Sequence, residues 1–251
     1  MCRLSYVPNR YSLVTHIVIK PPTADVLNPL LLLGRNGENG VEPAGSAVLC
    51  YRDGFEYLIT ALHVAKLSNF NPLLRFRKQW YENTWQILAV NEQYDIAILK
   101  SSIELDPKHI PILYGEPEGF VYGQVGYALG FPRLFDATPP NTDHITEANG
   151  RPIPLAALVV ANFTSDKTAT YSASYINDGF SGGAIVFPVG RTKWTVAGII
   201  THFPTVFRPV LRRNQRTNRL EETGEFVQQH TGLVGYTPFG VIENIVAESI
   251  R

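Results

Sequence analysis

The fold is decided by the stretch Asn177-Asp178-Gly179-Phe180-Ser181-Gly182-Gly183-Ala184, which sets one serine among glycines just before an apolar run at 185–187. Glycines allow backbone N–H groups to converge where a bulkier chain could not pass. A serine hydroxyl is a weak nucleophile unless a base takes its proton, an acid orients that base and donors stabilise the developing oxyanion. Ser181 is therefore the candidate nucleophile, and the rest of the chain must supply a histidine and a carboxylate.

Both partners stand upstream, each at one end of an apolar run. Residues 58–62 are apolar and β-branched and lead to His63, whereas Asp95 precedes the apolar run 96–99. Taken alone, His63 fits a core histidine and Asp95 fits a turn residue. Together with Ser181 they predict a catalytic triad, with His63 and Asp95 each at a strand end.

The three segments, taken in order, carry a family resemblance. Residues 60–63 (TALH), 94–99 (YDIAIL) and 179–183 (GFSGG) resemble the catalytic segments of trypsin-like serine proteases. The variant that the chain most resembles is the bacterial high-temperature-requirement type, here without its peptide-binding domain. That match rests on residues 176–179, 126–132 and 232–238, and the resemblance covers roughly 45–250.

Residue order excludes a rival hydrolase. The segment 179–183 also satisfies G-x-S-x-G, the nucleophile elbow of α/β-hydrolases, in which the acid and then the histidine follow the serine. No aspartate follows Asp178, and a short β-like run, rather than a long helix, follows Ser181. The elbow is therefore disfavoured.

Short runs rich in Val, Ile, Tyr and Phe recur between Gly, Pro and Asn residues, a pattern typical of an all-β fold. We expect two antiparallel six-stranded β-barrels of the chymotrypsin type and a C-terminal helix that packs on the second barrel. An Asp-Gly pair at 53–54 predicts a hairpin turn. The expected division places His63 and Asp95 in 1–114, with an N-terminal extension, and Ser181 in 115–251. The predicted strands are 47–51, 56–60, 96–100, 125–129, 158–162, 184–187 and 195–201.

Composition limits the partners and the compartment. Lys plus Arg and Asp plus Glu number 22 each, so the overall charge favours neither nucleic acid nor a membrane surface. Only Cys2 and Cys50 are present, which fits a reducing compartment, and the first residues lack a signal-peptide pattern. We expect a cytoplasmic protein with no nucleic-acid or membrane partner and with Cys50 in the core.

The resemblance also implies the remaining site residues. The backbone N–H groups of Gly179 and Ser181 would form the oxyanion hole, and no metal or organic cofactor would be needed. The specificity pocket would include Tyr175, Thr201, His202 and Phe203, although His202 fits better as a residue packed beside Phe203. With no acid among these residues, a small or medium apolar side chain is expected before the scissile bond.

Two features bear on regulation. Phe180 stands where secreted zymogens carry an aspartate that pairs with a newly cut N-terminus, so we expect no activation by N-terminal cleavage. Two long segments, 135–152 and 204–230, exceed what a minimal protease of this type needs; the first is expected to be an exposed loop. The second carries five arginines and three glutamates and is either a lid or docking arm for a regulatory partner or a solvated, mobile insertion.

The expected function is a serine endopeptidase that acts on a protein or peptide substrate. The alternative is a latent or inactive protease-fold module that binds a peptide or protein without cutting it. A viral-type processing protease suits the small number of cysteines but not the encoded Met1.

Overall fold

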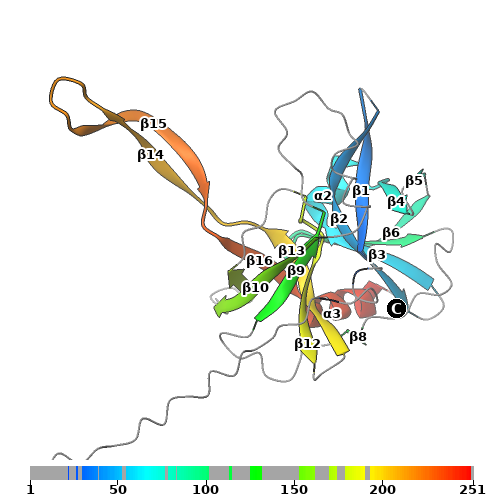
Figure 1. The fold of residues 1–251 in the computed structure, drawn as a ribbon. Helices are drawn as coiled ribbons and strands as arrows, with labels where there is room; N and C mark the ends of the chain where they lie inside the picture. Colours follow the sequence, from blue (N-terminus) through cyan, green and yellow to red (C-terminus); the bar gives the residue numbers. More distant parts are fainter. Residues whose placement is uncertain are drawn as a thin grey trace, which may run out of the picture.

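The computed structural model describes residues 22, 27, 30–38, 40–52, 55–76, 79–82, 84–101, 113–114, 125–131, 153–161, 170–173, 179–189 and 193–249. Within these ranges the chain forms two large antiparallel sheets, one long hairpin and a C-terminal helix (Figure 1). The all-β class and the C-terminal helix predicted from the sequence are confirmed. The hairpin turn residues 53–54, the loop 135–152, Cys2 and most of the expected boundary near 111–119 lie outside the described residues.

The first sheet has seven strands in the order β5-β4-β1-β2-β3-β7-β6. Leucines and other apolar side chains from its strands bury one another, and Leu33, Leu58 and Leu99 are fully buried. Arg52 pairs with Phe55, the register that a two-residue hairpin requires. Among the described residues no pairing joins the two edge strands, so the first barrel is not closed by hydrogen bonds. The strands are β1 (Leu30–Gly37), β2 (Gly40–Arg52), β3 (Phe55–Ala61), β4 (Leu73–Phe76), β5 (Gln79–Tyr81), β6 (Trp85–Asn91) and β7 (Ile96–Ser101).

The second sheet closes on itself. Its strands pair in the cycle β12-β9-β10-β11-β16-β13-β12, which gives the six strands expected for the second barrel. β8 (Leu113–Tyr114) adds to this barrel as a parallel partner of β13. The barrel strands are β9 (Val125–Gly130), β10 (Ile153–Ala161), β11 (Thr170–Ala173), β12 (Ala184–Val189), β13 (Lys193–His202) and β16 (Leu233–Pro238).

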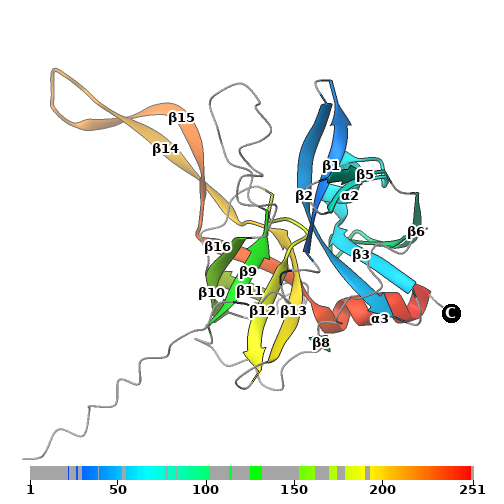
Figure 2. The ribbon, with the colours of Figure 1, turned by 45° about the vertical axis from the view of Figure 1, so that its right-hand side comes forward.

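Helix α3 (Phe239–Ser249) closes the chain beneath both sheets (Figure 2). Its buried residues Phe239, Ile242, Ile245 and Val246 share one core cluster with residues of the first sheet, such as Ile59, and of the second, such as Val196. The helix therefore packs on the second barrel, as the sequence predicted, and on the first sheet as well. Cys50 is buried in the same cluster, as expected. No helix in the described ranges is long and apolar enough to span a membrane.

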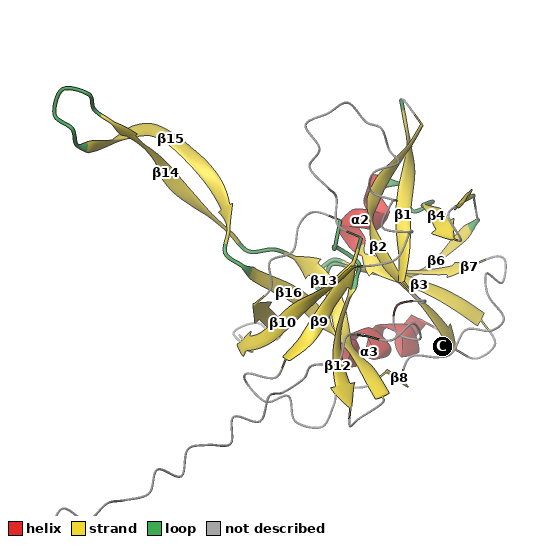
Figure 3. Ribbon diagram, viewed as in Figure 1, coloured by secondary structure: helices red, strands yellow, loops and turns green. Residues whose placement is uncertain are grey.

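The segment 204–230 forms a long two-stranded hairpin, which the sequence did not predict. Among the described residues, strands β14 (Thr205–Arg213) and β15 (Leu220–His230) pair only with each other, and they project far from the two sheets (Figures 1 and 3). Frequent arginines and glutamates hide the strand pattern, because charged residues are typical of loops as well as of strands exposed on both faces.

Candidate active site

His63 and Asp95 are joined by side-chain and backbone contacts. His63 lies in the first turn of the short helix α2 (Leu62–Leu67), which begins where β3 ends, rather than on the strand itself. Its Nδ1 lies 2.7 Å from Asp95 Oδ2, and its backbone N–H donates to Asp95 Oδ1 at 3.0 Å. Because an ionised carboxylate only accepts hydrogen bonds, this contact places the ring proton on Nδ1 and leaves Nε2 as the acceptor. The pair has the tautomer that a general base requires.

Asp95 holds this position in a strained turn. It ends the turn at 92–95 before β7, with φ +52° in the left-handed region that aspartate and asparagine tolerate better than most residues. Its carbonyl accepts the Leu62 N–H at 2.8 Å, which ties the turn to α2. Thr237 of β16 donates through Oγ1 to the Tyr94 carbonyl at 2.7 Å. The second barrel therefore holds the turn that presents Asp95.

Residues 179–183 form the tight turn that precedes β12. Gly182 N–H donates to the Ile200 carbonyl at 2.7 Å, and Gly183 N–H donates to the Phe180 carbonyl at 2.8 Å. Gly182 has φ +83°, and a Cβ there would overlap the Ser46 carbonyl oxygen and Thr60 Oγ1. Only glycine meets both conditions. Gly182, next to the candidate nucleophile, thus allows close packing against the first sheet.

Ser46, which the sequence interpretation missed, joins the two halves at this turn. Its N–H donates to the Ser181 carbonyl at 2.8 Å, and its Oγ donates to the Gly179 carbonyl at 2.6 Å and accepts the Phe131 N–H at 3.0 Å. Thr60 Oγ1 in turn donates to the Ser46 carbonyl at 2.8 Å. Ser46 is fully buried. The available signal was a polar residue next to Gly45 within the otherwise apolar run 43–50.

A cavity of about 270 Å³ lies where the two sheets meet, and it brings the candidate residues together. His63 lines it from the first half, and Gly179, Ser181 and Phe203 line it from the second. Its other lining residues are Leu32, Pro43, Ala44, Gly45, Leu67 and Phe131. Ser181 is buried, at 8% exposure, and among the described residues its Oγ makes no direct hydrogen bond to the His63 ring. The candidate base and the candidate nucleophile therefore line one cavity without a hydrogen bond between them.

The two expected oxyanion donors are Gly179 and Ser181. In the described part of the chain neither backbone N–H donates a hydrogen bond, whereas those of Gly182 and Gly183 are both used. Gly179 has φ +98°, a conformation that favours glycine. Asp178, which shares a peptide bond with the Gly179 nitrogen, lies outside the described residues.

Of the four expected specificity residues, the structure places one, Phe203, on the cavity wall. Tyr175 lies outside the described residues, and Thr201 is buried in β13. His202 Nδ1 lies 3.2 Å from Thr201 Oγ1, and its ring lies over Gly235, where a Cβ would overlap it. Burial lowers the pKa of His202; the charge of Asp95 opposes this and that of His63 adds to it. His202 is therefore packed against β16 and within electrostatic reach of the His63–Asp95 pair.

Comparison with known proteins identifies the family. Residues 45–199 match the family model of the trypsin-like peptidase domain, a match that covers well over half of the chain and includes His63, Asp95 and Ser181. The chain belongs to the trypsin-like peptidase family. No curated protein sequence matches this trypsin-like peptidase.

Solved structures of other proteases share the fold. The HtrA-type protease AlgW with a decapeptide superposes with a TM-score of 0.58 at 17% identity, covering 90% of this chain and 65% of that one. AlgWS227A with a tripeptide superposes with a TM-score of 0.58 at 19% identity, covering 90% of this chain and 62% of that one. The serine endoprotease from Yersinia pestis superposes with a TM-score of 0.57 at 17% identity. This superposition covers 92% of this chain and 68% of that one. This trypsin-like peptidase thus spans less than two thirds of the two AlgW chains, and its predicted similarity to the HtrA type is confirmed at the level of the fold.

Proposed function

We propose that this trypsin-like peptidase is an active serine endopeptidase that cuts a protein substrate through His63, Asp95 and Ser181. The observation that carries the proposal is the 2.7 Å contact between His63 Nδ1 and Asp95 Oδ2, made beside a cavity that His63 and Ser181 both line. This contact leaves Nε2 free to accept the proton of a nucleophile. The cavity lies between the two sheets, which is a common place for a binding site.

The reaction follows from these groups. Ser181 Oγ attacks the carbonyl carbon of the scissile peptide bond while its proton passes to His63 Nε2. The Gly179 and Ser181 N–H groups stabilise the resulting oxyanion, and Asp95 stabilises the imidazolium. Collapse of the tetrahedral intermediate breaks the C–N bond, and His63 returns the proton to the leaving amine. Water then hydrolyses the acyl-enzyme ester by the same steps.

The cavity lining supports an apolar substrate side chain. None of its ten residues is acidic, and apart from His63 and Ser181 they are apolar residues or glycines. A buried arginine or lysine of the substrate would therefore lack a counter-charge, which is energetically costly. We expect cleavage after small or medium apolar residues. A peptide library cut chiefly after Arg or Lys would contradict this preference.

The second candidate function is a latent module that binds a peptide without cutting it. It is favoured by the missing hydrogen bond between Ser181 Oγ and the His63 ring, although such contacts often tighten only once substrate is bound. The test is labelling by a serine-directed fluorophosphonate probe. Endopeptidase activity requires that wild type is labelled, that Ser181→Ala is not and that His63→Ala is labelled far more slowly. Unlabelled wild type would favour the latent module.

Cytoplasmic residence, without nucleic-acid or membrane partners, stays a prediction from the cysteine and charge composition.

A further inference from the structure

The β14–β15 hairpin is the largest feature that the proposed catalysis does not use. It starts directly after Phe203, which lines the cavity, and returns to β16 of the second barrel. Its base is closed by Thr231, whose N–H and Oγ1 donate to the Pro204 carbonyl at 3.1 and 2.9 Å. It also lies after residues 45–199, the part that matches the family model. The hairpin is thus an extension of the cavity wall that the family model does not include.

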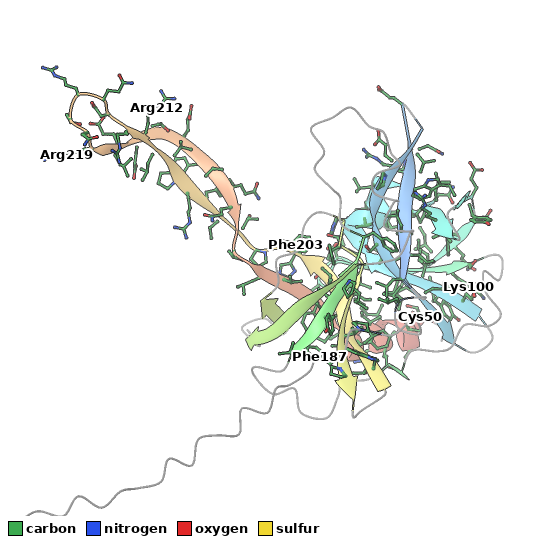
Figure 4. The ribbon with its side chains drawn as sticks, viewed as in Figure 1. Cys50, Lys100, Phe187, Phe203, Arg212 and Arg219 are labelled. Atoms are coloured by element: carbon green, nitrogen blue, oxygen red, sulfur yellow. The ribbon has the colours of Figure 1, made fainter. Side chains whose placement is uncertain are left out.

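Positive charge gathers at its far end. Residues 211–219 contain four arginines, Arg212, Arg213, Arg216 and Arg219, and no acid. All four are exposed, and Arg212 and Arg219 mark the tip in Figure 4. Within the described residues none of the four forms an ion pair; Arg213 donates instead to Asn218 Oδ1 at 3.1 Å.

The nearest acid at the tip is already engaged. Glu221 faces Arg212 in the strand register, yet its two carboxylate oxygens accept from Asn214 Nδ2 at 2.8 and 2.9 Å. Free guanidinium groups bind carboxylates in pairs of parallel hydrogen bonds. Glu221 keeps its negative charge, because Asn214 is neutral, but residues 211–222 carry four arginines against two glutamates. The tip therefore keeps a net positive charge that suits an acidic ligand.

Exposed apolar side chains accompany the arginines along the hairpin. Of the nine large hydrophobic residues that are exposed in the described ranges, six lie on it, with Phe207 at 69% and Phe226 at 64%. The register places Phe207, Leu211, Leu220 and Phe226 on one face. Phe207 and Leu211 alternate with Pro209 and Arg213 along β14, and Phe226 and Leu220 pair with Pro209 and Arg213. An isolated two-stranded hairpin is marginally stable in water, and apolar patches of this kind mark interaction sites.

We propose that the hairpin is a docking arm for an acidic, extended segment of the protein substrate that is cut in the cavity. This inference rests on the proposed function. Charge complementarity with the tip selects the acidic segment, and the apolar face accepts its apolar residues. Nine strand residues at about 3.3 Å each extend roughly 30 Å, so the acidic segment lies on the order of nine residues from the scissile bond. Continuity with the cavity wall favours a polypeptide that spans both sites over a nucleic acid or a membrane.

Binding is tested on Ser181→Ala, which removes the nucleophile. Fluorescein-labelled peptides carry a Val-Ala core, a nine-residue Gly-Ser spacer and a tail of six Glu, six Gln or six Lys, with the tail at either end. We expect the better of the two Glu-tailed peptides to bind about tenfold more tightly than its Gln-tailed counterpart, and added salt to weaken it. The charge-reversed hairpin, with Arg212, Arg213, Arg216 and Arg219 each changed to Glu, loses this preference and binds the Lys-tailed peptide instead. Binding of the Lys-tailed peptide also shows that the charge-reversed hairpin is folded, so no separate control for misfolding is needed.

Two results would overturn the docking arm. One is equal affinity for Glu-tailed and Gln-tailed peptides in both orientations. The other is tighter binding of poly(U) RNA or phosphatidylserine vesicles than of either Glu-tailed peptide. The apolar face is tested separately, because Phe207→Ser with Phe226→Ser lowers affinity for the Glu-tailed peptide only if that face takes part in docking.

Turnover separates this inference from the proposed function. In the active enzyme the charge-reversed hairpin lowers kcat/KM for the Glu-tailed peptide about tenfold and leaves the untailed Val-Ala core peptide unchanged. If the enzyme cleaves the peptides and the tail has no effect on kcat/KM, the peptidase activity is supported and the docking arm is contradicted. If Ser181→Ala binds the Glu-tailed peptide but wild type does not cleave it, the docking arm is supported and the proposed peptidase activity is contradicted.

Discussion

The backbone N–H of Ser46 donates a 2.8 Å hydrogen bond to the carbonyl of Ser181, across the junction between the two sheets. The same residue holds the Gly179 carbonyl through its Oγ at 2.6 Å. A residue of the first sheet therefore sets the path of the turn that carries the candidate nucleophile and both candidate oxyanion donors.

Ser46→Ala should weaken both stability and catalysis. The change leaves the Gly179 carbonyl and the Phe131 N–H without their partner in a buried site, a loss of about 1 to 3 kcal/mol in the free energy of unfolding. Urea unfolding measures the first effect, and the rate of fluorophosphonate labelling measures the second. Ser249→Ala, which removes a hydrogen bond to the Ile245 carbonyl in α3, is the control and should leave labelling unchanged. Normal labelling in Ser46→Ala would mean that Ser46 does not position the turn.

Gly182→Ala should be far more damaging than Gly224→Ala. Both glycines have positive φ, +83° and +79°. Holding alanine in this left-handed conformation should therefore destabilise the folded state by a similar amount at each position, about 1 to 2 kcal/mol. Only at 182 would the Cβ overlap Ser46 and Thr60; around Gly224 the space is open. We expect Gly182→Ala to cost at least about 2 kcal/mol more, since the buried backbone must shift. Equal urea midpoints for the two variants would show that the close approach does not matter.

Asp95→Asn tests the orienting role of the carboxylate. Asparagine tolerates the positive φ of this position, so the turn should persist while the acceptor for His63 Nδ1–H is lost. The corresponding change in a trypsin-like enzyme lowers kcat about 10⁴-fold because the ring adopts the wrong tautomer. We expect a loss of similar order in kcat on an apolar peptide, with a circular dichroism spectrum like that of wild type. A loss below tenfold would remove Asp95 from the triad.

His202 should make the fold less stable in mild acid. Burial lowers its pKa in the folded state below the ordinary value of about 6.5, so the unfolded chain takes up the proton first as pH falls. Stability is then full above about pH 6.5 and declines as pH falls toward the lower, folded-state pKa. His202→Asn should show a smaller difference between urea midpoints at pH 7 and pH 5 than wild type does. An identical difference would mean that His202 titrates normally.

Activity should not require a new N-terminus. Phe180, the residue before the candidate nucleophile, is fully buried among Ile185, Phe187 and Tyr236 and carries no charge to pair with an amino group. Deleting residues 1–20 should therefore leave kcat/KM within about twofold of the full chain, since no ion pair is lost. The control is the same chain left unprocessed during purification, verified by its intact mass. Activity that appears only after cleavage between residues 11 and 20 would contradict this expectation.

The sequence by itself determined which residues are candidates for the chemistry of the site. His63, Asp95 and Ser181 were predicted because nucleophilic catalysis requires those residue types, and their order disfavoured the α/β-hydrolase arrangement. Each of the seven predicted strands overlaps a described strand, because short runs of β-branched and aromatic residues are a local property of the chain.

Tertiary structure decided which groups meet. Ser46 and Gly179 are 133 residues apart, and no local pattern announces a hydrogen bond between them. The same holds for His202 over Gly235, and for α3, whose contacts with both sheets depend on how the sheets pack. The charged segment 204–230 became a hairpin because backbone pairing between its two arms, rather than burial of an apolar face, defines its strands.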